Sequence, residues 1–187
     1  MRRAGLFGLI LFLFGCAVAG NAVDRTTIEV DGARLFFNGV ITSRTPARFE
    51  AAIAAHPDVA TVVLLDMPGS LDAGADHRIG RLIRTEGLDT HLTAASEIYS
   101  GAVSVFLGGN RRTADKGAVI GVHSWADGFG EGSSYPRDAW EHEDNVAYAR
   151  AMLGSDAFYW FTLQAAASDG IHVMTDREIA RFGLLTR

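Results

Sequence analysis

The sequence predicts an α/β fold with a largely parallel sheet. Short β-rich runs alternate with segments whose apolar residues recur at helical spacing, the pattern of strands joined by helical crossovers. One of these runs, Thr61–Leu65, is continuously apolar, which is typical of a strand buried on both faces. The chain has 187 residues, of which 48% are hydrophobic, so one domain with a sizeable core is expected.

The first elements are marked by local signals. Thr26–Val30 and Arg34–Ile41 are β-rich and flank Asp31-Gly32, which predicts a hairpin. Thr45-Pro46 then opens a helix, because threonine is a good cap and proline suits the first helical position. That helix runs to His56-Pro57, and the buried strand Thr61–Leu65 follows.

The middle of the chain continues the alternation. Met67–Ser70 predicts a tight turn, and a helix with apolar residues at helical spacing follows and ends at Gly87. His91–Ala95 is expected to be the next strand, Gly101–Leu107 a buried helix of small and apolar residues, and Ala118–His123 another strand.

The last third is predicted to be mainly helical. Gly128–Ser134 is rich in glycine and serine and is expected to be a loop. Asp138 is then expected to cap a long helix from Ala139 to about Ala167. A short final helix is predicted between Thr175 as its cap and Gly183 as its end.

Composition excludes several functional classes. The net charge of −5 argues against general nucleic-acid binding, which normally needs a basic surface. A single cysteine excludes an intramolecular disulfide and a Cys-rich zinc module. We expect no metal: His142 lies among acidic neighbours that point in different directions around a helix, so a solvated helix face is predicted there. No cofactor is expected either, because Gly108-Gly109-Asn110 lacks the spacing of a phosphate-binding loop.

Residues 1–22 have the marks of an export signal. Arg2 and Arg3 precede an uncharged apolar run that ends in small residues, as in a secretory signal peptide. Leu13–Cys16 also resembles a lipoprotein box, which would make Cys16 a lipidation site, and a tethering helix remains an alternative. We therefore expect an exported protein, periplasmic or envelope-associated, with residues 23–187 folded as a single domain.

Ser100 and His123 are candidates for catalysis. Ser100 stands where a strand turns into a helix of small residues, and His123 ends an apolar strand 23 residues later. A serine hydroxyl needs a base to become a good nucleophile, and a neighbouring strand end is a place from which a histidine could act. On spacing alone, a helix-capping Ser100 and an ordinary strand-end His123 are the favoured interpretation. The turn Pro68-Gly69-Ser70 offers backbone N–H groups for an oxyanion or is simply a strand-to-helix connection.

The order of these parts resembles the Clp-type serine peptidases of the Clp/crotonase superfamily, and their secreted bacterial relatives most closely. The segments that carry the resemblance are Leu65–Gly69, Gly80–Arg84, Tyr99–Ala102, Phe106–Gly109, Val122–Ser124 and Glu178–Leu184. The resemblance implies a spiral of ββα units with a long C-terminal handle helix.

The resemblance also implies a site. Ser100 would be the nucleophile and His123 the general base, while Gly69, Ser70 and Gly101 would stand near the oxyanion. A third catalytic acid would precede the final helix, and Asp169 is the nearest carboxylate to that place, with Asp176 next. Ser70 stands where the family usually has a second glycine.

Three functions follow as hypotheses. The first is an exported serine peptidase acting on short peptides or unfolded proteins. The second is a catalytically inactive binding or assembly module with the same fold in the periplasm. The third is acyl-CoA chemistry, against which an exported location without a CoA supply argues. In related folds the loop Gly128–Ser134 and the helix 139–167 lie between subunits, so a homo-oligomer is expected.

Overall fold

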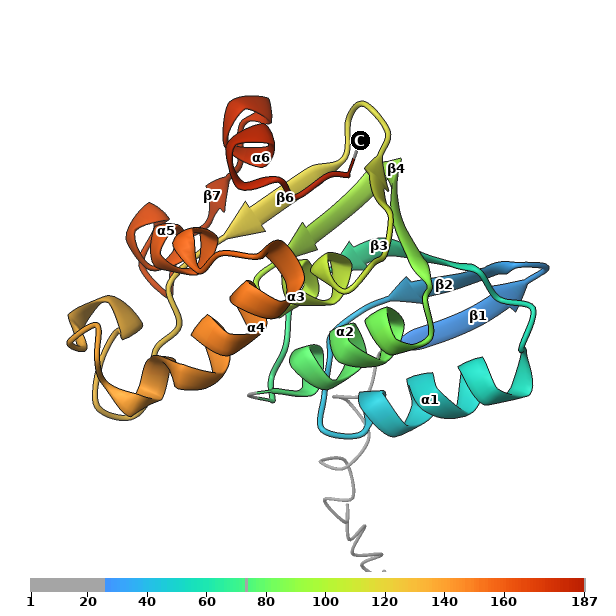
Figure 1. Ribbon diagram of the computed structural model, residues 1–187, viewed down its shortest axis with the longest axis horizontal. Coiled ribbons are helices and arrows are strands. Elements are labelled where there is room, and N and C mark those ends of the chain that lie inside the picture. The colour runs from blue at the N-terminus through green and yellow to red at the C-terminus, as the bar shows by residue number, and fades with distance from the viewer. Residues whose placement is uncertain (1–25, 73, 187) are drawn as a thin grey trace, which may run out of the picture.

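The computed structural model describes residues 26–72 and 74–186. The predicted signal segment, residues 1–22 with Cys16, lies outside the described residues. The order of the described strands and helices confirms the predicted α/β class (Figure 1).

Seven strands form one mixed sheet. Its order is β1-β2-β3-β4-β6-β7, and β5 pairs with β4 on the same side as β6. Every pairing among β2, β3, β4, β5 and β6 is parallel, whereas β1 and β7 join the two ends in antiparallel orientation. The strands are β1 (Thr27–Asp31), β2 (Arg34–Asn38), β3 (Thr61–Met67), β4 (Asp89–Tyr99), β5 (Arg112–Ala114), β6 (Val119–Val122) and β7 (His172–Val173).

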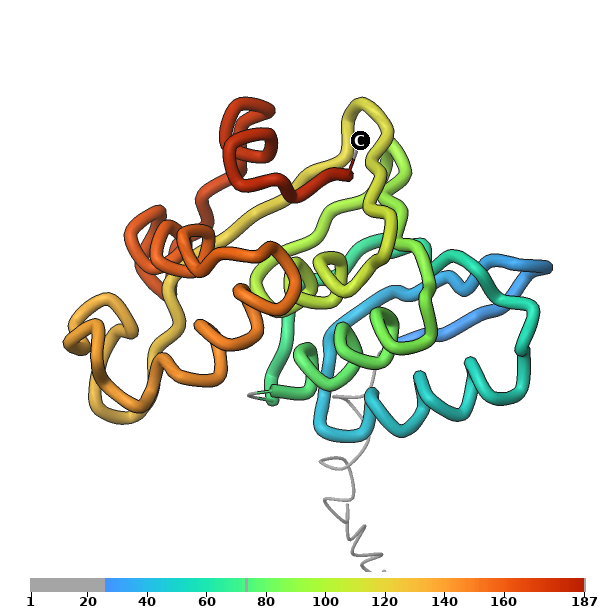
Figure 2. The backbone as a smooth tube through the Cα atoms, in the orientation of Figure 1, coloured from blue at the N-terminus to red at the C-terminus, as the bar shows by residue number. Residues whose placement is uncertain are grey.

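The helices connect and cover these strands. α1, α2 and α3 lie side by side along one side of the sheet (Figure 1). α4 is joined to α3 by a hydrogen bond from the Tyr148 hydroxyl to the Ser104 carbonyl at 2.6 Å. The backbone trace shows that the segment between β6 and α4 extends away from the sheet (Figure 2). The helices are α1 (Thr45–Ala55), α2 (Ala75–Thr85), α3 (Gly101–Leu107), α4 (Glu143–Leu153), α5 (Ala157–Ala165) and α6 (Asp176–Phe182).

Local signals place several element ends where the sequence predicts them. Gly32 takes a φ of 55° in the β1–β2 hairpin, a conformation that glycine adopts without cost. α1 begins at Thr45 with proline in its first turn. Thr175 caps α6 in a full capping box with Glu178, and Gly183 ends it in the left-handed conformation.

The predicted long helix over residues 139–167 is wrong. The chain forms a 3₁₀ turn (Trp140–His142), then α4, then a break, then α5. The break falls at Gly154, which ends α4 with a φ of 75°, in the left-handed region. After it, the Ser155 hydroxyl accepts a hydrogen bond from the Ala157 amide at 3.1 Å and helps to start α5.

A bend in β4 brings the site residues to the sheet edge. The register between β3 and β4 shifts between Leu64 and Asp66, so β4 pairs with β5 through its first half and with β6 through its second half. The fully buried Ser96 provides hydrogen bonds for backbone groups at the bend. Its hydroxyl donates to the Leu64 carbonyl at 2.5 Å and accepts from the Thr93 amide at 2.9 Å. The second half of β4 then ends at Tyr99, directly before Ser100.

The core lies between the sheet and the row of helices. The largest side chains that are fully buried there belong to the strands, the first three helices and the connection after β2: Phe37, Phe49, Phe106, Leu35, Ile41, Leu64, Met67, Ile79, Ile83, Leu92, Ile98 and Ile120. α3 is mostly buried, as its small and apolar residues predict. This packing holds the start of α3 in place, and Ser100 stands there.

Candidate active site

Ser100 has an unusual backbone conformation. Its φ and ψ are 53° and −126°, and it is the only residue other than glycine with a positive φ in the described part of the chain. These angles are those of the first central position of a type II′ turn, which glycine normally occupies. The Ser100 amide donates to the Gly121 carbonyl at 3.1 Å, and its carbonyl accepts from the Val103 amide at 2.9 Å. Strain of this kind persists only where the surroundings enforce it and is concentrated at functional sites.

The turn after β3 packs directly against Ser100. Gly69 has a φ of 126°, and a Cβ placed on it would stand 3.0 Å from the Ser100 Cβ and 3.5 Å from its hydroxyl oxygen. A Cβ on Gly101 would stand 2.7 Å from the Ser70 Cβ. The two glycines thus allow the turn and the start of α3 to approach each other closely.

Two backbone N–H groups at this contact are free. Neither the Ser70 amide nor the Gly101 amide has a hydrogen-bond acceptor among residues 26–72 and 74–186. Both residues line the same cavity as Ser100. Ser70 does not have a positive φ, so the turn does not require glycine there, and the departure from the family pattern leaves the free amide in place.

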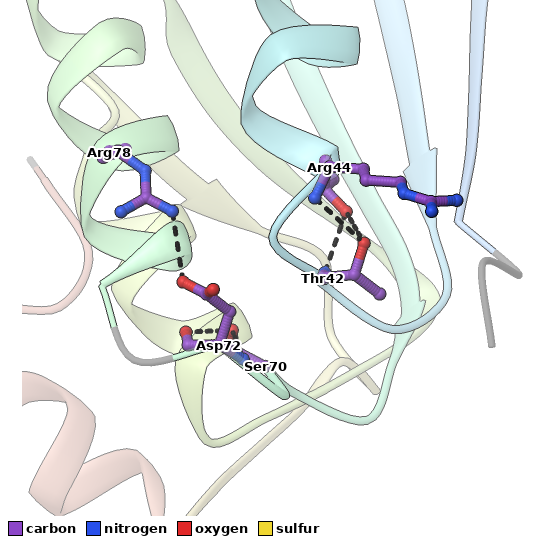
Figure 3. A network of polar contacts seen from close by, with 6 residues as sticks. Thr42, Arg44, Ser70, Asp72 and Arg78 are labelled. Atoms are coloured by element: carbon purple, nitrogen blue, oxygen red, sulfur yellow. Dashed lines mark hydrogen bonds and ion pairs between the residues drawn. The ribbon is translucent and has the colours of Figure 1, made fainter.

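Polar contacts hold this turn against α2 (Figure 3). The Ser70 hydroxyl donates to the Asp72 carbonyl at 2.8 Å, and the Arg78 guanidinium donates to the Asp72 carboxylate at 3.1 Å. On the other side, the Ile41 amide donates to the Gly69 carbonyl and the Leu71 amide donates to the Ile41 carbonyl, each at 2.9 Å. The carbonyl of Gly69 is therefore turned toward Ile41, and the next amide in the chain, that of Ser70, is left without a partner.

His123 follows β6 and lines the same cavity as Ser100. Its Nδ1 lies 2.6 Å from the Ser124 carbonyl oxygen, which can only accept, so this contact assigns the proton to Nδ1. Nε2 is then the basic nitrogen. In the described residues no hydrogen bond joins Ser100 Oγ to His123, although both side chains line the same cavity. The volume of this cavity is about 600 Å³.

The expectation for Asp169 is not met. This residue lies exposed in the turn after α5 and does not line the cavity. The Ser124 carbonyl oxygen already contacts His123 Nδ1, which is the nitrogen that a third catalytic acid would contact. The carboxylate near His123 is instead that of Glu131, from the loop after β6. Hydrogen bonds from Ser168 lower the pKa of Glu131, with a smaller contribution from His123. Asp176 belongs to the first turn of α6.

The cavity wall also contains Asp76, which sequence reasoning missed, and His77, which it placed near the cleft as a surface residue. Both come from the first turn of α2 and line the cavity. The His77 ring stacks on Tyr148 of α4, with 4.0 Å between ring centroids and 6° between planes. Burial is the main cause that lowers the pKa of His77 below 6.5. The charged segment Asp76-His77-Arg78 is typical of a surface, and nothing in it indicates that α4 covers this end of α2.

His142 also differs from the prediction. Its side chain is buried, with Nδ1 2.6 Å from the Tyr159 hydroxyl, and aromatic rings surround it: Trp125, Tyr135, Tyr159 and Trp160. The segment before α4 folds back onto α5, which a helix over 139–167 would not do. Within residues 26–72 and 74–186, no cluster of three or more His, Cys, Asp or Glu side chains is arranged to hold a metal ion. None of the helices in that part of the chain has both the length and the apolar character to cross a membrane.

Solved structures with the same arrangement decide the fold. A variant of the 1510-N membrane-bound stomatin-specific protease matches with a TM-score of 0.56 and 17% identity, over 80% of this chain and 75% of that chain. A ClpP1 variant from Listeria monocytogenes matches with a TM-score of 0.57 and 10% identity, over 82% and 88% of the two chains. The chain has the Clp/crotonase fold.

The Clp/crotonase fold also includes enzymes that act on CoA esters. A protein from Streptomyces avermitilis assigned as an enoyl-CoA hydratase matches with a TM-score of 0.52 and 12% identity, over 89% of this chain and 68% of that chain. No protein-family model matches the sequence, and no curated protein matches it. At these identities the Clp/crotonase fold is shared, and function has to be argued from the site.

Proposed function

We propose that the chain is a serine peptidase-like hydrolase in which Ser100 is the nucleophile and His123 the general base. The observation that supports it best is the strained backbone of Ser100, beside the free amides of Ser70 and Gly101. The cavity that these residues line is also lined by His123, whose Nε2 is the basic nitrogen. A structure of the stomatin-specific protease holds a substrate peptide, and the proposal extends peptide binding to this chain.

The geometry supports acyl transfer in two steps. Ser100 Oγ attacks the peptide carbonyl carbon while His123 Nε2 accepts the hydroxyl proton, and the carbonyl oxygen gains the negative charge. The amides of Ser70 and Gly101 donate to that oxyanion, next to the close contact at Gly69. His123 then gives the proton to the leaving amine, and water releases the acyl group from Ser100 by the same sequence. Catalytic hydrogen bonds are often long without substrate, and substrate binding is expected to close the gap between Ser100 and His123.

Hydrolysis of short fluorogenic peptides and of an unfolded protein tests this function. Ser100→Ala is expected to abolish turnover, and His123→Ala to reduce kcat by roughly 10²–10⁴-fold, the usual contribution of a general base. Ser43→Ala, at an exposed serine that does not line the cavity, is the control and should retain activity. Turnover that persists in Ser100→Ala would overturn the proposal.

We propose export to the periplasm or envelope as part of the same function. The support is sequence alone: the basic start, the apolar run and the small residues up to about residue 22. Cell fractionation and the intact mass of the mature protein test it. Cleavage near residues 19–22 is expected for a secreted form, and a lipid-modified Cys16 for an anchored form. An unprocessed chain in the cytoplasm would contradict export.

We also propose a homo-oligomer. Ile171 and Val173 are large apolar side chains left exposed at β7, the last strand of the sheet. An unprotected sheet edge of this kind is a surface that proteins normally cover. One full chain has a mass of 20.0 kDa. Light scattering after gel filtration should give a multiple of the mass of one chain, and Val173→Lys should lower the measured mass. A monomer at micromolar concentration would contradict the proposed homo-oligomer.

A further inference from the structure

The cavity beside Ser100 is acidic. Among residues 26–72 and 74–186 no lysine or arginine lines its wall, whereas five carboxylates do: Asp72, Asp76, Asp127, Glu141 and Asp144. Two of these have partners of their own. Asp72 is paired with Arg78 at 3.1 Å, and Asp127 accepts hydrogen bonds from the Tyr135 hydroxyl and two backbone amides. The chain as a whole carries a net charge of −5. The cavity therefore attracts positive charge.

Asp76 differs from the other carboxylates because it is buried and accepts no hydrogen bond among the described residues. The residue exposes only 8% of its surface, and its carboxylate forms no hydrogen bond in the described part of the chain. Its oxygens are not sealed from solvent, because the only fully enclosed polar side-chain atom without a partner among residues 26–72 and 74–186 is His142 Nε2. The free oxygens of Asp76 thus open onto the cavity that it lines.

Asp76 stands close to the reacting serine. Its Oδ2 lies 3.1 Å from the place that a Cβ on Gly101 would occupy, one residue after Ser100. The nearest group able to carry positive charge is His77, whose Nε2 is 3.9 Å from Oδ2. Burial lowers the pKa of His77, which disfavours the charged form of its ring. Arg81 lies over Tyr148, 5.3 Å from the ring centroid, and does not line the cavity.

A buried carboxylate without a partner is costly, which favours a cationic ligand for it. We propose that Asp76 binds the ammonium or guanidinium group of a substrate lysine or arginine, so that the site selects peptides with a cationic side chain next to the bond that Ser100 attacks. This inference rests on the proposed peptidase function and adds the substrate class.

The rest of the wall suits such a side chain. Tyr148 and His77 form a flat stacked pair in the wall, and Trp140 stands at the cavity with 74% of its surface exposed. Aromatic faces of this kind pack against the alkyl stem of lysine or arginine and attract its charge. A metal ion is a poorer occupant, because Asp76 belongs to no three-ligand cluster in residues 26–72 and 74–186.

Matched peptide substrates test the selectivity. Three fluorogenic peptides that differ only in the residue before the scissile bond, lysine, norleucine or glutamate, are compared by kcat/KM. The wild-type chain should prefer lysine over norleucine at least tenfold and glutamate least. In Asp76→Asn, which keeps the side-chain shape, the lysine preference should fall below threefold. Asp115→Asn is the control, because this exposed acid directly after β5 does not line the cavity and should keep the wild-type ratio. Equal ratios in wild type and Asp76→Asn would overturn the inference.

A binding measurement separates this inference from the peptidase function. The lysine and norleucine peptides are titrated into Ser100→Ala and into the double variant Ser100→Ala/Asp76→Asn by calorimetry. We expect tighter binding of the lysine peptide in the first protein and loss of that difference in the second. If the wild type hydrolyses no peptide but this binding pattern holds, the peptidase proposal fails and the cation site stands. If peptides are hydrolysed without any lysine preference, the cation site fails and the peptidase stands.

Discussion

The strain at Ser100 predicts that a glycine there raises stability. A non-glycine residue in such a conformation costs about 1–3 kcal/mol. Glycine relieves that cost but makes the unfolded chain more flexible, which costs about 0.4–1 kcal/mol. The net expectation is that Ser100→Gly is about 1 kcal/mol more stable than Ser100→Ala, because alanine keeps the Cβ and therefore the strain. For a domain of this size that difference is roughly 2–4 °C in Tm.

Urea unfolding followed by circular dichroism measures this difference. The matched control is the same pair of substitutions at Ser104, inside α3. There glycine should be about 1 kcal/mol less stable than alanine, since the position is ordinary helix. The sign of the glycine-minus-alanine difference is thus expected to be opposite at the two serines. If glycine is also the less stable residue at position 100, the backbone there is not strained and the main structural support for a catalytic serine is lost.

Three further predictions concern the turn, the cavity wall and the last helix. Gly69→Ala should lower kcat by at least a hundredfold in the peptide assay, because its Cβ would press on Ser100 at 3.0 Å, and wild-type turnover would contradict the oxyanion geometry. Because burial lowers the folded-state pKa of His77, the unfolded chain binds the extra proton. The free energy of unfolding should therefore fall as pH drops below about 6.5, and His77→Gln should show a shallower fall. Thr175→Ala should cost about 1 kcal/mol by removing the cap of α6, and an unchanged urea midpoint would contradict this.

Elements with local signals were predictable from the sequence. The hairpin at Gly32, the start of α1 and both ends of α6 each depend on one or two residues whose backbone preferences act without help from the rest of the chain. The alternation of strands and helices then predicts the sheet class.

Features that depend on contacts between distant segments were not predictable. β7 has two residues and exists because it pairs with β6, about fifty positions earlier. The break at Gly154 is a different case, because its signal is local: a glycine that ends a helix is followed by the capping residue Ser155. The prediction of one helix over residues 139–167 overlooks this signal.

The residues of the candidate site also fall into those that the sequence predicts and those that it does not. Ser100 and His123 could be singled out because each stands at the end of a strand pattern. The carboxylate near His123 comes from a loop with no regular pattern, so Asp169, nearer to the position implied by the resemblance, was expected in place of Glu131. The burial of Asp76 has no signal in the neighbouring sequence, because α4, which closes the cavity over it, lies some seventy residues further along the chain.

Covalent labelling with a fluorophosphonate tests the central claim most directly, because the reagent reacts with an activated serine hydroxyl and leaves a mass tag on it. Peptide mapping should locate a single adduct on Ser100. The labelling rate should fall at least a hundredfold in His123→Ala, whereas Ser43→Ala, outside the cavity, should label as the wild type does. No adduct on Ser100, or an equal rate in His123→Ala, would contradict the pairing of this serine and this histidine.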